Sequence, residues 1–143
     1  MRDLHSNLGL IQTLDPAITT ASRAGAPVDR QGFESVEHVV LIGISGDTLS
    51  GVNTISLQLD ESEDGSNWSP VVDDSHVLGA AISEAGIFAV IDDGAEDGFP
   101  RSIGYVGDAR YSRVQVVLAG THSNGTPVGA MAFLGHANIK PVS

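Results

Sequence analysis

The fold is decided by the stretch Thr54-Ile55-Ser56-Leu57-Gln58-Leu59-Asp60-Glu61. Three aliphatic residues, Ile55, Leu57 and Leu59, alternate strictly with polar residues. In an extended chain successive side chains point to opposite faces, so this alternation puts all three aliphatic side chains on one face. The stretch therefore predicts a β-strand with one face buried and the other face in water.

Short apolar stretches separated by glycine, proline and polar residues predict more strands on both sides of it. Residues 36–44 are apolar at both alternating positions and rich in β-branched side chains, so we expect a strand that is covered on both faces. Residues 111–119 have the same character. The remaining expected strands are residues 8–14, 68–72, 87–91, 102–106 and 128–135.

Two turn sequences suggest how some of these strands connect. Asp64-Gly65, inside residues 61–68, predicts a hairpin that leads into residues 68–72. Asn124-Gly125 readily supplies the two positive φ angles of a type I′ turn, which predicts a hairpin over residues 111–135. No stretch of the chain has a convincing amphipathic helix pattern.

These elements favour the all-β class, as an antiparallel β-sandwich or jelly-roll-like fold of about 7–8 strands. A chain of 143 residues fits one domain, because independent domains commonly have about 100–150 residues. Residues 1–30 are rich in alanine and threonine and have weak periodicity. We expect them to form an extended N-terminal arm or an edge segment of this single sandwich domain.

The charge excludes two classes of partner. The formal net charge is −11, from 7 Lys and Arg against 18 Asp and Glu, and no Lys or Arg occurs between Gln31 and Pro100. Nucleic acids and anionic membranes are bound by clustered basic side chains, so we expect neither as a partner. The chain has no cysteine, which excludes disulfides, thiolate metal sites and a cysteine nucleophile.

Patterns that suggest catalysis or metal binding are incomplete. Residues 60–65 match the opening of a calcium-binding loop, but Val71 stands where that loop needs a bidentate glutamate. Ser45 lacks the surrounding glycine pattern of a nucleophile elbow. His38 shares its strand phase with Val36 and Val40, which places it at the edge of the core or in an interface. The sequence therefore predicts no catalytic residues, no metal and no cofactor.

Four segments of the chain, residues 1–7, 28–35, 57–68 and 103–114, resemble a family of small virion proteins from tailed bacteriophages, prophages and gene transfer agents. These proteins are usually encoded near the major capsid protein. The closing Leu134-Gly135-His136-Ala137 also fits, although such proteins often continue with a basic or histidine residue where this chain has Asn138. The resemblance spans the chain.

The resemblance implies a non-enzymatic capsid decoration or cement protein, or the base of a vertex spike. It implies the major capsid protein as partner, a homo-oligomer such as a trimer or pentamer, and contact with another spike or fibre protein. Such a protein is made in the bacterial cytoplasm and ends on the capsid exterior. The family pattern and apolar character point to Arg2, Leu4, Leu8 and Phe33 as attachment residues.

Two other functions remain open at this stage. Trp68 directly follows an acidic turn, and with Tyr111 it could form a sugar-binding platform of a carbohydrate-binding sandwich module for host-surface adhesion. In the competing interpretation, Trp68 caps one end of the core while Arg110 or Arg113 pairs with carboxylates. The third function is a head–tail connector or tail component, which predicts rings of six copies.

Overall fold

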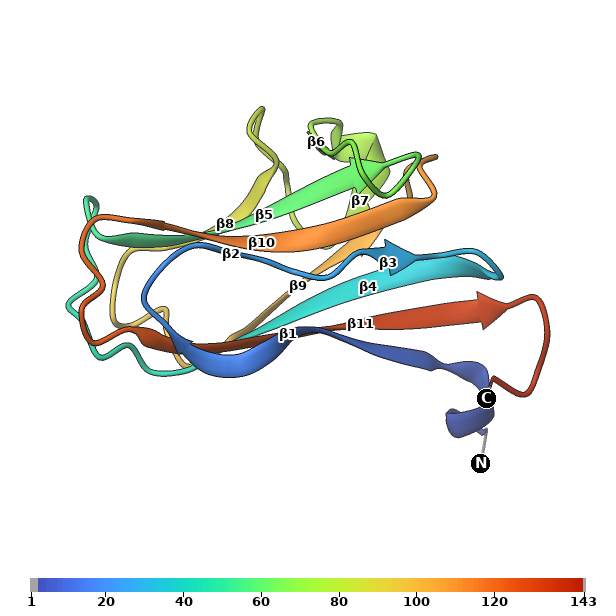
Figure 1. Ribbon diagram of the computed structural model, residues 1–143, viewed down its shortest axis with the longest axis horizontal. Coiled ribbons are helices and arrows are strands. Elements are labelled where there is room, and N and C mark those ends of the chain that lie inside the picture. Colours follow the sequence, from blue (N-terminus) through green and yellow to red (C-terminus); the bar gives the residue numbers. More distant parts are fainter. Residues whose placement is uncertain (1–2, 143) are drawn as a thin grey trace.

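The computed structural model describes residues 3–142 and confirms the all-β class. Within these residues eleven strands form two antiparallel sheets, which pack as two layers of a sandwich (Figure 1). Sheet A has the order β1 (Gly9–Thr19), β11 (Thr126–Ala137), β4 (Phe33–Ile42), β9 (Pro100–Tyr105) and β7 (Val77–Leu78). Sheet B contains β2 (Arg23–Ala24), β10 (Tyr111–Ala119), β5 (Thr54–Ser62) and β6 (Ser69–Pro70), with β3 (Val28–Asp29) paired to β10 and β8 (Ile87–Ile91) paired to β5.

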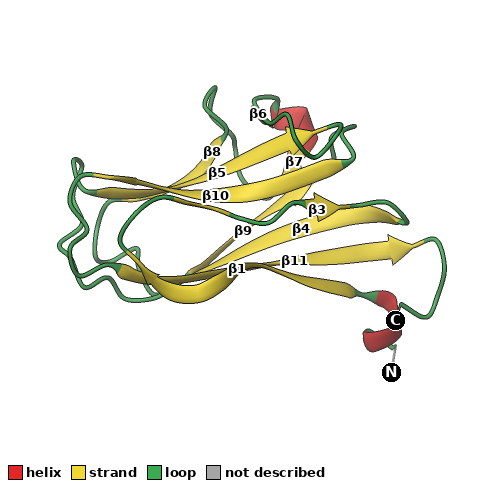
Figure 2. Cartoon of the chain, viewed as in Figure 1, coloured by secondary structure: helices red, strands yellow, loops and turns green. Residues whose placement is uncertain are grey.

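All the strands expected from the sequence are present, and β8 and β10 have the expected bounds. The additional strands β2, β3 and β7 have two residues each, too few for an alternating pattern. The described residues also contain two short 3₁₀ helices, η1 (His5–Asn7) and η2 (Asp74–His76), drawn in red in Figure 2. Within residues 3–142 no helix has the length and apolar character needed to cross a membrane.

The core lies between the two sheets and follows the alternation seen in the sequence. Ile55, Leu57 and Leu59 of β5 are fully buried, as expected. Val114 and Val116 of the neighbouring β10 are also fully buried. Sheet A supplies the opposite wall, which consists of Val36, Val40, Ile42, Ile103, Tyr105, Val128, Ala130, Ala132 and Leu134.

Residues 9–29 form edge segments of this sandwich. β1 pairs with β11 along its length and is bent by two β-bulges between Gln12 and Ala17, with Pro16 inside the second. The chain then passes to sheet B, where β2 and β3 pair with β10. Arg23 of β2 stabilises this connection, because its guanidinium donates a hydrogen bond of 2.8 Å to the carbonyl oxygen of Asp15 in β1. The segment expected as an arm or an edge is thus an edge from Gly9 onward.

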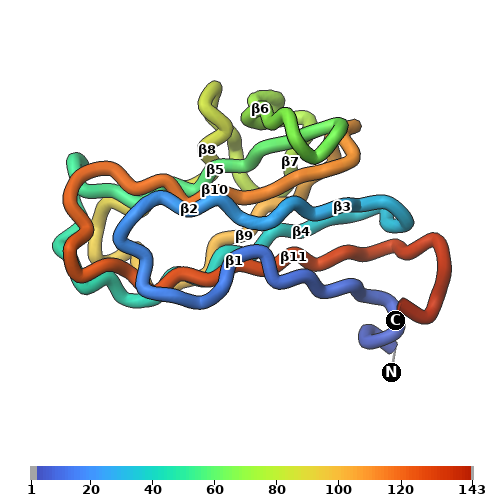
Figure 3. The backbone as a smooth tube through the Cα atoms, in the orientation of Figure 1, coloured from blue at the N-terminus to red at the C-terminus, as the bar shows by residue number. Residues whose placement is uncertain are grey.

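The expected hairpin over residues 111–135 is wrong. β10 belongs to sheet B and β11 to sheet A, so the connection between them crosses from one layer to the other, as Figure 3 shows. Gly125 has a positive φ of 78°, but Asn124 does not, so the two-residue type I′ geometry is absent. Instead the Asp47 carboxylate accepts hydrogen bonds from the backbone N–H groups of Asn124 (3.0 Å) and Gly125 (2.7 Å). These bonds hold the pKa of Asp47 below its ordinary value.

Replacing Gly125 with alanine is expected to lower the free energy of unfolding by about 2 kcal/mol, because the left-handed backbone disfavours a side chain. The added methyl group would also lie 2.7 Å from the side chain of Ile18 and 2.9 Å from the Thr19 carbonyl oxygen. Urea unfolding measures the effect. Gly94→Ala is the control, since nothing lies within 4 Å of its new methyl group, and it should change stability by less than about 0.5 kcal/mol. Equal effects of the two substitutions would contradict the prediction.

The second expected hairpin, at Asp64-Gly65, is confirmed. β5 and β6 pair through Asp60 with Pro70 and through Glu61 with Ser69. The Asp64 carboxylate accepts hydrogen bonds from the backbone N–H groups of Asn67 and Ser66, both at 2.8 Å, and these bonds lower its pKa. The carboxylate that resembled a calcium ligand therefore closes a turn.

Candidate functional site

The outward surface of sheet A is apolar, although no third layer formed by residues 3–142 covers it. The register places Leu10 beside Phe133, Met131 beside Val39, and Leu78 next to Gly104, so their side chains share this surface. Several of them are largely exposed, including Leu10 at 61% and Leu41 at 50%. We call this surface the outer A face and define it by Leu10, Ile18, Val39, Leu41, Leu78, Met131 and Phe133.

The outer A face is also nearly free of charge. Glu37 is the one acidic or basic residue at the outward positions of β4, β9 and β11. On β1 the exposed Asp15 adds a second carboxylate, which accepts a hydrogen bond from Gln12 beside Met131. The outward surface of sheet B differs, because β5 and β10 place Gln58, Asp60, Arg113 and Gln115 there in facing pairs. An antiparallel sandwich normally presents polar residues to water, so only sheet B has the surface of an independent domain. Contiguous apolar surface of this kind marks an interaction site.

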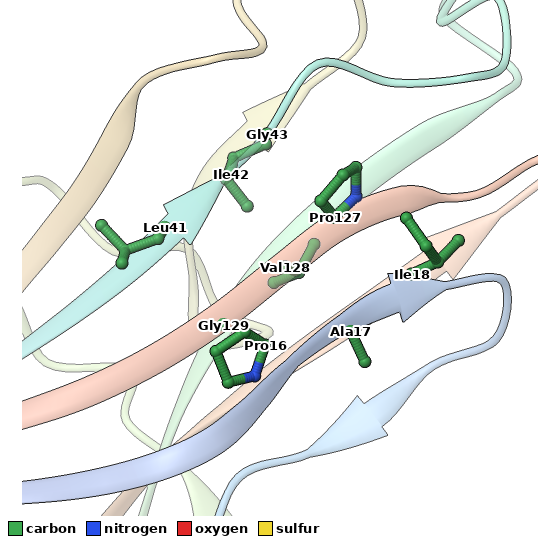
Figure 4. Close-up of a pocket in the computed structure, with 9 residues that line it drawn as sticks. All are labelled: Pro16, Ala17, Ile18, Leu41, Ile42, Gly43, Pro127, Val128 and Gly129. Carbon is green, nitrogen blue, oxygen red and sulfur yellow. The ribbon is translucent and has the colours of Figure 1, made fainter.

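One end of the outer A face is hollowed into an apolar groove of about 500 Å³ between β1, β11 and β4 (Figure 4). Ile18, Leu41 and Pro127 line it, one from each of the three strands. Gly129 lies between them, and a methyl group at this position would lie 3.2 Å from Pro16. The missing side chain therefore keeps the groove open.

The other end of the face continues into a second hollow of about 820 Å³ beside the two chain termini, which we call the terminal groove. Leu4, Leu8 and Phe33, expected as attachment residues, all line it. Leu10 and Phe133 line it too, so it is continuous with the outer A face. The structure thus brings together three of the four residues chosen from the sequence. The fourth, Arg2, lies outside the described residues.

Trp68 and Tyr111, the candidates for a sugar platform, are both half-buried on sheet B. The Arg113 guanidinium lies over the Trp68 ring, 4.3 Å from its centre, and pairs with Asp60 at 3.1 Å. Arg110 lies 5.0 Å from the centre of the Tyr111 ring and pairs with Asp29 at 2.6 Å. Each aromatic ring therefore has a cation of the same chain on one face, and both arginines pair with carboxylates.

Tyr105 and Glu61 form a further polar contact, which joins the two sheets. The Tyr105 hydroxyl donates to Glu61 Oε2 at 2.5 Å and accepts from the Ala109 backbone N–H at 3.1 Å. Burial, together with the bond to Glu61, raises the pKa of Tyr105 above its ordinary value. Across residues 3–142 no three His, Asp or Glu side chains lie close enough to hold a metal ion.

The outer A face was not singled out from the sequence, although one signal for it was present. Residues 36–44 are apolar at both alternating positions, which led us to expect cover on both faces. In the structure Val36 and Val40 are covered by sheet B, whereas Val39 and Leu41 face outward without cover. Residues 3–142 therefore do not supply the second covering layer that the sequence led us to expect.

Comparisons with known proteins add little. No protein-family model matches the chain, and no curated protein matches it. One solved structure with some similarity is the "Structure of infectious bursal disease virus Gx strain", at a TM-score of 0.22 and 15% identity. The alignment covers 93% of this chain and 37% of that one. A similarity this low supports neither a shared fold nor a shared function.

Proposed function

We propose that the chain is a non-enzymatic structural protein of a virion, attached to the outside of a phage-like capsid. It acts as a decoration or cement protein, or as the base of a vertex spike. The observation that carries the proposal is the outer A face, a nearly uncharged apolar surface on a chain of net charge −11. A surface of this kind fits permanent attachment to another protein surface.

In this arrangement the outer A face and the terminal groove lie against the major capsid protein. The acidic hairpin of β5 and β6, which belongs to the opposite sheet, faces the solvent. Negative charge on that side keeps neighbouring particles apart and repels nucleic acid. A trimer or pentamer would present several outer A faces to one shell, and this multivalency strengthens binding without new contacts. A further spike or fibre protein would bind on the solvent side.

Replacing Leu41 with aspartate tests the proposal, because it places an unpaired charge in the apolar groove at one end of the outer A face. We expect the variant to bind about tenfold or more weakly to empty capsid shells of the parent phage that lack this chain. Co-sedimentation with the shells, read out by quantitative mass spectrometry, measures occupancy and copy number.

Val72→Asp is the matched control, since Val72 is 55% exposed against 50% for Leu41 but lies outside sheet A. Its binding should equal that of the unaltered chain. Failure of the unaltered chain to bind shells, or equal binding by the Leu41→Asp variant, would overturn the proposal. Six copies per particle instead of capsid-wide occupancy would favour the head–tail connector.

The carbohydrate-binding alternative gains no specific support from the geometry. A sugar platform needs an accessible aromatic ring face and polar groups with free hydrogen-bonding capacity. Arg113 occupies one face of Trp68, and the nearby Asp60 carboxylate already accepts from Gln58, Arg113 and Gln115. These contacts agree with one part of the competing interpretation, the pairing of Arg110 and Arg113 with carboxylates. Trp68 itself stacks on Arg113 and is not among the side chains that pack against the core.

A further inference from the structure

Glu37 is an unusual residue on the outer A face. It is half-buried, and it lines a groove of about 590 Å³ together with Leu78, Gly104 and Phe133. Its Oε2 atom lies 2.9 Å from the position that a methyl group on Gly104 would occupy, and Leu78 Cβ lies 3.3 Å from that position. Gly104 therefore leaves the space into which the carboxylate extends, in a groove whose lining also includes Asp3, His136 and Lys140.

The Glu37 carboxylate has no hydrogen bond and no ion pair with any of residues 3–142. Lys140 lines the same groove but lies beyond ion-pair distance and is exposed. A half-buried carboxylate without a partner keeps its charge only through contact with water. Covering the outer A face with an entirely apolar surface would remove that water and destabilise the complex.

The charge of Glu37 distinguishes between two occupants of the face. A second copy of this chain, related by a twofold axis that passes beside Glu37, would bring another Glu37 against the first. The outward positions of β4, β9 and β11 contain no Lys or Arg to pair with it, and the basic residue of the groove, Lys140, lies on the exposed C-terminal segment. Two carboxylates would then face each other in an apolar contact. A different protein that is apolar but carries one basic side chain would neutralise Glu37 and cover the leucines.

We propose that the outer A face binds a capsid-shell surface that is apolar except for one Lys or Arg, whose cation pairs with Glu37 above Gly104. This inference rests on the proposed function and names the chemistry of the partner surface. The pair sets the position of the chain on the shell, because a single charge in an apolar contact has one favourable register. The surrounding aliphatic contacts exclude water from it.

The same empty shells test the inference with Glu37→Gln and Glu37→Lys. Glu37→Gln removes the charge and should weaken binding about tenfold. Glu37→Lys places a second cation against the Lys or Arg of the shell and should weaken binding about a hundredfold. Glu63→Lys is the matched control: it makes the same charge change at the exposed tip of the β5–β6 hairpin. It should bind as the unaltered chain does. Circular dichroism establishes that all the variants are folded.

The outcomes separate this inference from the proposed function. If the unaltered chain does not bind shells, the proposed function itself fails. If it binds and Glu37→Lys binds equally well, attachment stands and the Glu37 pair is refuted. Sedimentation of the chain alone gives the third outcome: a dimer that Leu41→Asp dissociates would make a second copy the occupant and overturn the inference.

Discussion

Lowering the pH from about 7 to about 4 is expected to remove about 3 kcal/mol of stability through one side chain, His38. His38 lies between the sheets, is fully buried, and shares a hydrogen bond of 2.8 Å between its Nε2 and the Ser112 hydroxyl. Its Nδ1 has no partner. Burial lowers its pKa from 6.5 to about 4, because the charged ring would lose water without gaining an ion-pair partner among residues 3–142.

The sign follows from proton uptake. Between pH 6.5 and about 4 the unfolded chain binds a proton at His38 and the folded chain does not, so stability falls as the pH falls through this window. Above pH 6.5 the histidine is neutral in both states and contributes no slope. At about 1.4 kcal/mol for each tenfold change in the equilibrium, the full window corresponds to about 3 kcal/mol.

Urea unfolding at a series of pH values measures this slope, and the difference between variants removes the contribution of the carboxylates. His38→Gln keeps a hydrogen-bonding group toward Ser112 but does not titrate, so its stability should vary less with pH by about 3 kcal/mol across the window. Ser112→Ala is the complementary control, since it weakens the hydrogen bond but leaves His38 buried. It should retain the slope. The same slope in His38→Gln would assign the effect to other groups.

The sequence was sufficient to predict the strands because burial on one face imposes a period of two. Ile55, Leu57 and Leu59 show this period without interruption, and β5 begins at the expected residue. His38 shows the limit of the argument. Its phase with Val36 and Val40 correctly places it inward, but the partner across the sandwich, Ser112, depends on how the sheets face each other.

Connections between strands were less predictable, because a turn sequence fixes local backbone angles and not the destination of the chain. Asn124-Gly125 suits a hairpin, yet here it lies in the connection from β10 to β11. Its backbone N–H groups donate hydrogen bonds to the distant Asp47 carboxylate. Asp47 and Asn124 are 77 positions apart along the chain, so no local signal connects them. Asp64-Gly65 gave a correct hairpin, because its stabilising hydrogen bonds all come from residues 62–67.

The candidate site was only partly predictable, for a related reason. Leu4, Leu8 and Phe33, which the family resemblance named as attachment residues, line one groove, and their role in attachment stays a prediction. The outer A face combines side chains from β1, β4, β7 and β11, and their adjacency follows from the sheet order alone. The unpaired state of Glu37 is likewise visible only once Gly104 and Leu78 are placed beside it.

A second large effect is expected on the opposite sheet, at Asp60. This carboxylate is 2% exposed and accepts hydrogen bonds from Gln58 (2.7 Å), Arg113 (3.1 Å) and Gln115. Asp60→Ala would leave the Arg113 guanidinium, whose side chain is 20% exposed, without its carboxylate. Removing one partner of a buried ion pair leaves an uncompensated charge, so the free energy of unfolding should fall by about 3 kcal/mol.

The comparison that isolates this effect is a double-mutant cycle with Arg113→Leu, measured by urea unfolding. Arg113→Leu alone removes the cation and the stacking on Trp68, but Asp60 keeps two glutamine donors. The double variant leaves neither charge buried, so its loss should be smaller than the sum of the two single losses by about 1–2 kcal/mol. Strictly additive losses would mean that the pair contributes no coupling, and the stability of this face would then depend on the hydrogen bonds of Gln58 and Gln115 alone.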